Sequence, residues 1–220
     1  RVVDTARRFG ITTKLEPFPS IALGSQEVTL WELVRAFGTF QSGGLRLDPY
    51  LIETIADSRG NVLYERPTYD RDRVYSEELD KEMNGMLTRV VNSDIGTGGR
   101  AKIKNWTVAG KTGTSQDWRD AWFIGFTSAY VGGVWVGNDD DTPMKKVTGG
   151  GLPADLWSDM MEIAHAGKRP EDLIGAETGA AVSEAAEQRI AFYRGLSQAF
   201  SIAAGQQFAS RTTPDRYQQQ

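Results

Sequence analysis

The stretch Ala109–Phe126, AGKTGTSQDWRDAWFIGF, carries most of what the sequence says about the fold. It joins a predicted strand over Trp106–Lys111 to a second over Trp122–Phe126, and a third predicted strand follows over Tyr130–Val136. The link at Thr127-Ser128 is too short for the crossover of a dozen residues that a parallel neighbour would need. We therefore expect an antiparallel sheet built from consecutive strands.

Helical patterns lie before and after these strands. Thr29 and Glu32 fit a capping box, in which the hydroxyl and the carboxylate each satisfy an unpaired backbone N–H. Ser76 is expected to cap a second helix, and Pro153 stands at the first position of a third. The buried stripe of the second helix is predicted to comprise Leu79, Met83, Met86, Leu87 and Val90. An antiparallel sheet flanked by helices places the chain in the α+β class.

The other predicted elements are short and precede the sheet: a helix over 2–9 and a hairpin of strands over 50–56 and 62–65. Residues 1–174 are expected to form a domain. Ala, Gln and Glu dominate residues 175–220, where we predict a helix over Val182–Phe208 and a disordered tail over Arg211–Gln220.

Composition excludes several kinds of site and partner. The 220 residues contain no cysteine, which rules out disulfides and thiolate metal sites. Their net charge of −4 argues against nucleic acid as a partner, because phosphate binding requires a basic face. The sequence contains no run of about twenty apolar residues, so no membrane-spanning helix is predicted. Because the chain opens on Arg1 and not on methionine, we expect a longer natural protein, whose upstream part would hold any membrane anchor.

The candidate functional motif is Lys111–Thr114, Lys-Thr-Gly-Thr. A P-loop is rejected, because its first glycine would fall at Asn105 and because Gly113–Ser115, which follow Lys111-Thr112, break the helix that a P-loop needs at this point. The aspartates at 139–141 are predicted to be a solvated turn. His165 is expected to lie mid-helix, at the surface or half-buried, without partners for a metal site. No cofactor or metal is therefore predicted.

From Arg1 to about Gly175 the chain resembles the C-terminal half of the transpeptidase domain of class A, bifunctional penicillin-binding proteins. The similar segments follow one another in the order of that family: Thr29–Gly44, Pro49–Glu65, Gly96–Ala101, Val108–Phe126, Trp135–Gly137, Asp139-Asp140, Gly149-Gly150 and Leu152–Trp157. Serine β-lactamases share the Lys-Thr-Gly triplet but not its continuation into Asp120–Phe123. The resemblance implies a β-lactamase/transpeptidase-like fold, of which this chain is a partial domain.

The resemblance also implies a reaction. In this family a serine attacks the D-Ala-D-Ala bond of a peptidoglycan stem, and the acyl-enzyme passes the stem to an amine of a neighbouring stem. β-Lactams acylate the same serine. The Ser-x-x-Lys and Ser-x-Asn elements that supply this chemistry do not occur in the 220 residues. We therefore expect the chain to be a fragment of a D,D-transpeptidase that is inactive alone.

The site residues implied by the resemblance lie in one run. Lys111 and Thr114 would be catalytic: the lysine would aid proton transfer, and the Thr114 N–H would be one oxyanion-hole donor. Thr112, Gly113, Thr114 and Ser115 would bind substrate. In that role the threonine hydroxyls donate to the substrate's terminal carboxylate, and Gly113 lets the extended substrate pair with the strand.

A second class of function stays open, namely a non-catalytic transpeptidase-like module that binds or senses β-lactams or peptidoglycan. A serine β-lactamase is disfavoured, because the run after the triplet differs. Ser-x-x-Lys followed by Ser-x-Asn in the upstream coding sequence would distinguish the enzyme from the module. The implied partners are peptidoglycan stem peptides, β-lactams and cell-wall synthesis proteins. The implied location is the periplasm or the extracytoplasmic face of the bacterial membrane.

Overall fold

The computed structural model describes residues 1–176, and the account below concerns these residues. The predicted helix over Val182–Phe208 and the tail over Arg211–Gln220 lie outside them. In chain order the elements are α1 (Val2–Arg8), η1 (Pro19–Leu23), α2 (Leu30–Gln41), β1 (Thr54–Ala56), β2 (Val62–Glu65), α3 (Glu77–Asn92), η2 (Gly99–Ala101), β3 (Ala109–Thr114), η3 (Gln116–Trp118), β4 (Asp120–Phe126), β5 (Val131–Gly137) and α4 (Leu152–Ala164).

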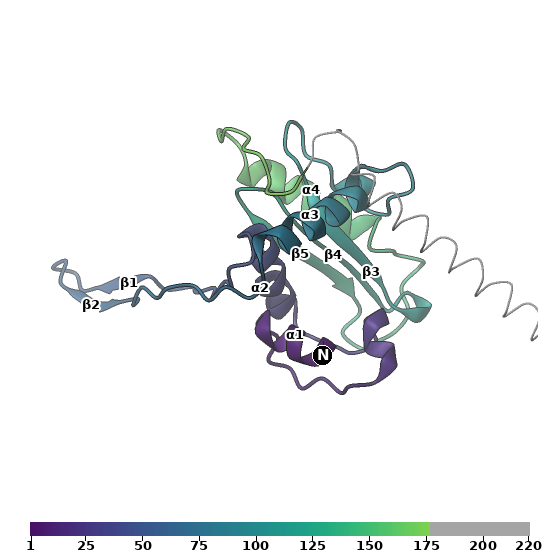
Figure 1. The fold of residues 1–220 in the computed structure, drawn as a ribbon, viewed down its shortest axis with the longest axis horizontal. Helices are drawn as coiled ribbons and strands as arrows, with labels where there is room; N and C mark the ends of the chain where they lie inside the picture. The colour runs from purple at the N-terminus through teal and green to yellow at the C-terminus, as the bar shows by residue number, and fades with distance from the viewer. Residues whose placement is uncertain (177–220) are drawn as a thin grey trace, which may run out of the picture. The chain divides into compact units, whose positions relative to one another are not determined.

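The central sheet has the order β3-β4-β5 and is antiparallel throughout, as the short link predicts (Figure 1). Gly113 lies opposite Trp122, and Trp122 lies opposite Trp135. The predicted bounds of the first strand, 106–111, are wrong at both ends. β3 continues to Thr114 because the Ser115 N–H still donates to the Asp120 carbonyl, at 2.9 Å, where the hairpin closes. The whole candidate motif is therefore part of the strand.

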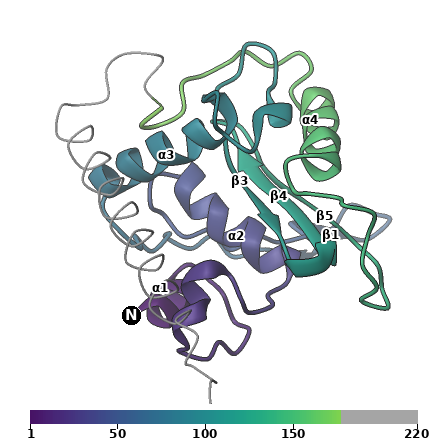
Figure 2. The same ribbon diagram turned by 90° about the vertical axis from the view of Figure 1, so that its right-hand side faces the viewer.

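Helices cover both faces of the sheet, so the fold is α+β as predicted (Figure 2). Because successive strand residues point to opposite faces, Phe123 and Phe126 of β4 belong to different cores. Phe123 packs on Trp157 of α4, with ring centroids 5.1 Å apart. Phe126 packs on the other side with Phe37 of α2 and Leu87 of α3. The face covered by α2 and α3 is called the α2 face below, and the opposite one the α4 face.

The capping box at the start of α2 is present as predicted. The Thr29 hydroxyl accepts the Glu32 N–H, and the Glu32 carboxylate accepts the Thr29 N–H at 3.0 Å. The same buried carboxylate also accepts the backbone N–H and the hydroxyl of both Thr12 and Thr13, at 2.7–2.8 Å. Glu32 therefore joins the loop after α1 to the first turn of α2, a long-range role that the capping pattern did not reveal.

The predicted buried stripe of α3 is only partly correct. Leu87 is buried, but Leu79 and Met86 are 55% and 57% exposed. The residues turned fully inward include the polar pair Asp80 and Asn84. The Asp80 carboxylate accepts the Tyr75 hydroxyl and, at 3.0 Å, the Asn84 amide, which also donates to the carbonyls of Phe40 and Ile174. These polar contacts rotate the helix away from the face that hydrophobicity alone predicts.

Asp80 makes stability depend on pH. Burial raises the pKa of its carboxyl to about 6, although the hydrogen bond from Tyr75 opposes the shift. The folded chain therefore binds a proton more tightly than the unfolded chain, so stability rises as pH falls from about 6 to about 4. We expect a gain of at most roughly 3 kcal/mol, at about 1.4 kcal/mol per pKa unit. Urea unfolding at pH 7.5 and pH 5 should show about half of this gain in the natural chain, because pH 5 lies about one unit below the folded pKa, and none in Asp80→Asn. An unchanged gain in the variant would assign it to another group.

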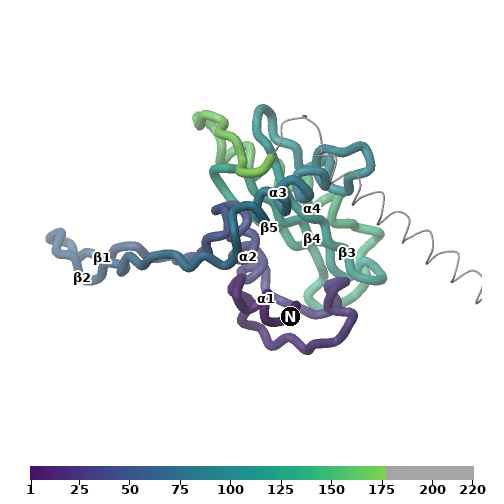
Figure 3. The backbone as a smooth tube through the Cα atoms, viewed as in Figure 1, coloured from purple at the N-terminus to yellow at the C-terminus, as the bar shows by residue number. Residues whose placement is uncertain are grey.

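The hairpin of β1 and β2 extends away from the sheet as a two-stranded ribbon (Figures 1 and 3). Its second strand has the predicted bounds, whereas its first begins at Thr54 and not at Tyr50. Every residue of both strands is exposed. Among the helices of residues 1–176, none has the length and apolar character needed to cross a membrane.

Candidate active site

The candidate motif lies on an edge strand. Among the described residues β3 pairs with β4 alone, so its other side is free. Ser115 and Asp120 form a hydrogen-bonded pair at the end of the ladder. Because bonded and non-bonded pairs alternate in an antiparallel ladder, the backbone N–H and C=O groups of Thr114 and Thr112 point to the free side. The edge therefore offers donors and acceptors in the arrangement that an added extended strand would need.

Lys111 is exposed, and its ammonium group lies beside this edge. The Nζ atom donates to the Thr112 carbonyl oxygen at 2.6 Å. Since that carbonyl points to the free side of β3, the side chain brings a positive charge to the edge. No ion pair of Lys111 occurs within the described part of the chain. The charge is thus available to an anionic ligand.

The two threonine side chains of the motif lie on the α4 face. Thr112 is paired with Phe123, whose side chain points to the α4 face, so the Thr112 side chain points there too. Thr114 lies two positions further along the strand and therefore points to the same face. The Thr112 hydroxyl is 2.6 Å from the Thr97 hydroxyl. The Thr114 hydroxyl accepts the backbone N–H of Gly149 at 3.0 Å. Two loops that are distant in sequence thus contact the motif, each through one of its two threonine hydroxyls.

The Gly149-Gly150 segment approaches the motif so closely that side chains are excluded. A Cβ atom at Gly149 would lie 2.3 Å from the Trp122 carbonyl oxygen and 2.4 Å from that of Gly113. One at Gly150 would lie 2.0 Å from the Thr97 carbonyl oxygen. At Gly113, by contrast, a Cβ would meet Trp122 at an ordinary 3.4 Å. The scaffold therefore requires glycine at 149 and 150 but not at 113.

Ser115 closes the hairpin after the motif. Its hydroxyl accepts the Asp120 N–H at 2.7 Å, and its own N–H donates to the Asp120 carbonyl. These bonds hold the backbone at the end of β3, and they leave the hydroxyl proton of Ser115 free to donate. The structure therefore gives Ser115 a supporting role at one end of the edge, and the predicted contact with substrate stays a prediction.

The aspartates at 139–141 form an exposed turn, as predicted. Asp140 accepts the Thr142 hydroxyl at 2.7 Å, and Asp141 pairs with Arg119 at 2.9 Å. Within residues 1–176 no three His, Cys, Asp or Glu side chains gather in a way that could hold a metal ion. The carboxylates of Asp140 and Asp141 are thus both engaged in contacts within the protein.

The expectation that His165 lies mid-helix, at the surface or half-buried, is wrong. This residue is buried and caps the C-terminus of α4. Its Nε2 atom is 2.8 Å from the Thr127 hydroxyl and its Nδ1 atom is 2.6 Å from the Met161 carbonyl oxygen. The rings of Trp106 and Tyr130 lie against it, with centroids 4.2 and 5.1 Å away. These aromatic partners come from distant segments, so position along the helix could not reveal them.

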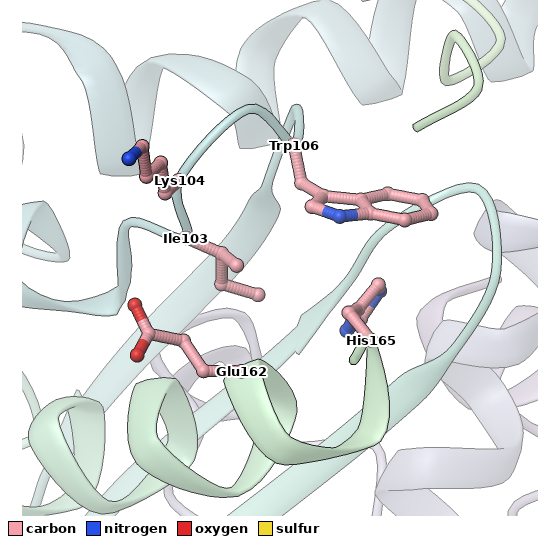
Figure 4. Close-up of a pocket in the computed structure, with 5 residues that line it drawn as sticks. All are labelled: Ile103, Lys104, Trp106, Glu162 and His165. Atoms are coloured by element: carbon pink, nitrogen blue, oxygen red, sulfur yellow. The ribbon is translucent and has the colours of Figure 1, made fainter. Parts of the chain in front are cut away.

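A shallow pocket of about 270 Å³ lies beside His165 (Figure 4). It is lined by Ile103, Lys104, Trp106, Glu162 and His165. Both ring nitrogens of the histidine are engaged within the protein, so the ring has no free atom to act as a base. The pocket is also at the start of β3, whereas the candidate motif is at its end. The free edge of β3 is therefore the stronger candidate site.

Known proteins are similar to the part of the chain that contains the candidate motif. A family model described as the penicillin binding protein transpeptidase domain matches residues 11–162. "Penicillin-binding protein 1A" of Rickettsia typhi is 34% identical over 188 residues, which cover 75% of this chain and 24% of that protein. The chain thus spans about a quarter of the length of the curated relatives it matches.

Solved structures with the same fold include two penicillin-binding proteins. The PonA1 protein of Mycobacterium tuberculosis in complex with penicillin V superposes with a TM-score of 0.71 and 22% identity, over 83% of this chain and 55% of that one. At that identity the likeness concerns the fold alone. Penicillin-binding protein 1A of Haemophilus influenzae gives a TM-score of 0.67 at 26% identity, over 76% of this chain and 31% of that one.

Proposed function

The chain belongs to the penicillin-binding protein transpeptidase domain family, and from this we propose that it forms the Lys-Thr-Gly wall of a serine D,D-transpeptidase site. In the proposed reaction a serine oxygen forms an ester with the penultimate D-Ala carbonyl carbon of a stem peptide while the terminal D-Ala leaves. An amine of a second stem then takes the acyl group. The observation that carries the proposal is the free edge of β3, along which Lys111–Thr114 presents an ammonium group and strand hydrogen-bonding groups.

The proposed role of Lys111 is electrostatic. Its ammonium group attracts the terminal carboxylate of a stem peptide or of a penicillin and assists proton transfer to and from the serine. Its exposed position at the edge and the absence of a carboxylate partner in the described residues support this role. A buried or paired lysine would be committed to the protein instead.

The remaining motif residues would hold the extended substrate. The Thr114 N–H, which the ladder turns to the free edge, is the proposed oxyanion-hole donor from this chain. The hydroxyls of Thr112 and Thr114 would donate to the carboxylate, and Ser115 would bound the site at the hairpin. Gly113 keeps the strand narrow for a substrate backbone, which agrees with the finding that the scaffold would accept a Cβ there.

In this proposal the nucleophile comes from outside the 220 residues, because they contain neither Ser-x-x-Lys nor Ser-x-Asn. The chain by itself would then be inactive. The proposed partners are peptidoglycan stem peptides and β-lactams, and the proposed location is the extracytoplasmic side of the bacterial membrane. The same missing elements favour a second candidate, a non-catalytic module that binds β-lactam or peptidoglycan without forming an acyl-enzyme.

Labelling with a fluorescent penicillin tests the proposal. We expect the full-length product of the gene to form a covalent adduct that survives denaturing electrophoresis, and the 220-residue chain to form none. Failure of both to label would favour the non-catalytic module. Labelling of the short chain would show that a nucleophile lies within it, which would contradict the proposed division of the site.

A further inference from the structure

The two threonine hydroxyls of β3 differ in how their hydrogen bonds can be arranged. Thr114 accepts from the Gly149 N–H, which is a donor only. Its one hydroxyl proton is therefore free to donate elsewhere. Thr112 is instead paired with Thr97, a second hydroxyl, at 2.6 Å, and either oxygen could be the donor. The direction of this bond decides what Thr112 can offer to a ligand.

A carboxylate only accepts hydrogen bonds. If Thr112 donated its proton to Thr97, the Thr112 oxygen would present only lone pairs to a carboxylate, and the two oxygens would repel each other. If Thr97 donates to Thr112, the Thr112 proton is free to point at the carboxylate. Both threonines of the strand then act alike, each accepting one bond from a loop behind it and donating one outward.

Thr97 is held in place on both sides. The Gly96 N–H donates to the Ser93 carbonyl and the Gly98 N–H to that of Val90, at 2.9 and 2.8 Å, which ties the turn to the end of α3. The Thr97 carbonyl is in close contact with Gly150, where no side chain would fit. Because the backbone on both sides of Thr97 is anchored, its hydroxyl holds its distance to β3 at a lower cost in conformational entropy than it would on a free loop.

We propose that Thr97 is a positioning residue for carboxylate recognition, since its hydroxyl donates to Thr112 and thereby directs the Thr112 proton toward the ligand. The inference rests on the proposed function and adds a residue outside the Lys-Thr-Gly-Thr motif. Thr97 itself does not touch the ligand. Its effect should therefore depend on whether the ligand carries a free carboxylate.

The test compares acylation of the full-length protein by a penicillin and by the methyl ester of its carboxyl group. Thr97→Val keeps the shape and removes the hydroxyl, whereas Thr97→Ser keeps the hydroxyl. We expect Thr97→Val to slow acylation by the free acid about fivefold to tenfold, the effect of one lost hydrogen bond. Acylation by the ester should stay within about twofold, and Thr97→Ser should behave as the natural protein does. Thr88→Val is the matched control, since its hydroxyl donates to the Asn84 carbonyl one helical turn away.

Each other outcome overturns the inference. If Thr97→Val slowed acylation by the acid and by the ester equally, Thr97 would only support the fold. A thermal unfolding curve of the variant would then show a loss of stability. An unchanged rate with the acid would mean that Thr112 needs no partner. If the natural full-length protein is not acylated at all, the proposed function is wrong and the inference falls with it, so the two failures can be told apart.

Discussion

Lys111→Ala in the full-length protein is expected to slow acylation by penicillin by about 10²–10³-fold, the usual effect of removing one preorganised electrostatic group from an active site. The ammonium group lies at the free edge of β3, where it donates a hydrogen bond to the Thr112 carbonyl oxygen. Removing an exposed side chain of this kind should cost less than about 1 kcal/mol of stability. Stopped-flow acylation and thermal unfolding together measure the two effects.

Lys104→Ala is the matched control for this prediction. Lys104 is also exposed, and it lies at the pocket at the start of β3, away from the motif. We expect its variant to be acylated at the natural rate. Near-normal acylation of Lys111→Ala would contradict the proposed role of Lys111. Slow acylation of Lys104→Ala would indicate that the pocket beside His165 contributes to the reaction.

Glu32→Ala is expected to give the largest loss of stability, about 3 kcal/mol, because hydrogen bonds to a buried carboxylate are strong and their loss leaves several donors without a partner. The carboxylate accepts from Thr12, Thr13 and Thr29 at 2.7–3.0 Å. Urea unfolding at pH 7 measures the change. Glu27→Ala, which removes an exposed glutamate five positions earlier in the chain, is the control.

The same residue should make the protein sensitive to acid. Burial alone would raise the pKa of Glu32, but the hydrogen bonds from Thr29, Thr12 and Thr13 outweigh it and hold the pKa well below its usual range. A carboxylate whose pKa is depressed by folding stabilises fully above its unfolded pKa, near 4.3, and loses that contribution as pH falls further. As pH falls, Asp80 therefore raises the stability between about pH 6 and pH 4, whereas Glu32 lowers it at more acidic pH. Glu32→Gln should flatten the stability curve below pH 4, and an equally steep curve in that variant would contradict the assignment.

Local patterns in the sequence predicted the elements that depend on neighbouring residues. The short link at Thr127-Ser128 correctly indicated an antiparallel pair, because chain length alone excludes a crossover. The capping box of Thr29 and Glu32 was correct because its two bonds span only three positions. Predictions that depended on the surroundings were less accurate. Leu79 and Met86 fit a helical period but are exposed, since the contacts of Asp80 and Asn84 determine which face of α3 turns inward.

The sequence by itself determined the family, the antiparallel strands and the run Lys111–Thr114, since each rests on adjacent residues. Only the tertiary structure decided that the motif occupies a free sheet edge, that Thr97 and Gly149 reach its two hydroxyls, and that His165 is buried. The physical reason is that hydrogen bonds and packing act over a few ångströms in space. They join residues 15 or 35 positions apart, and no local pattern encodes such separations.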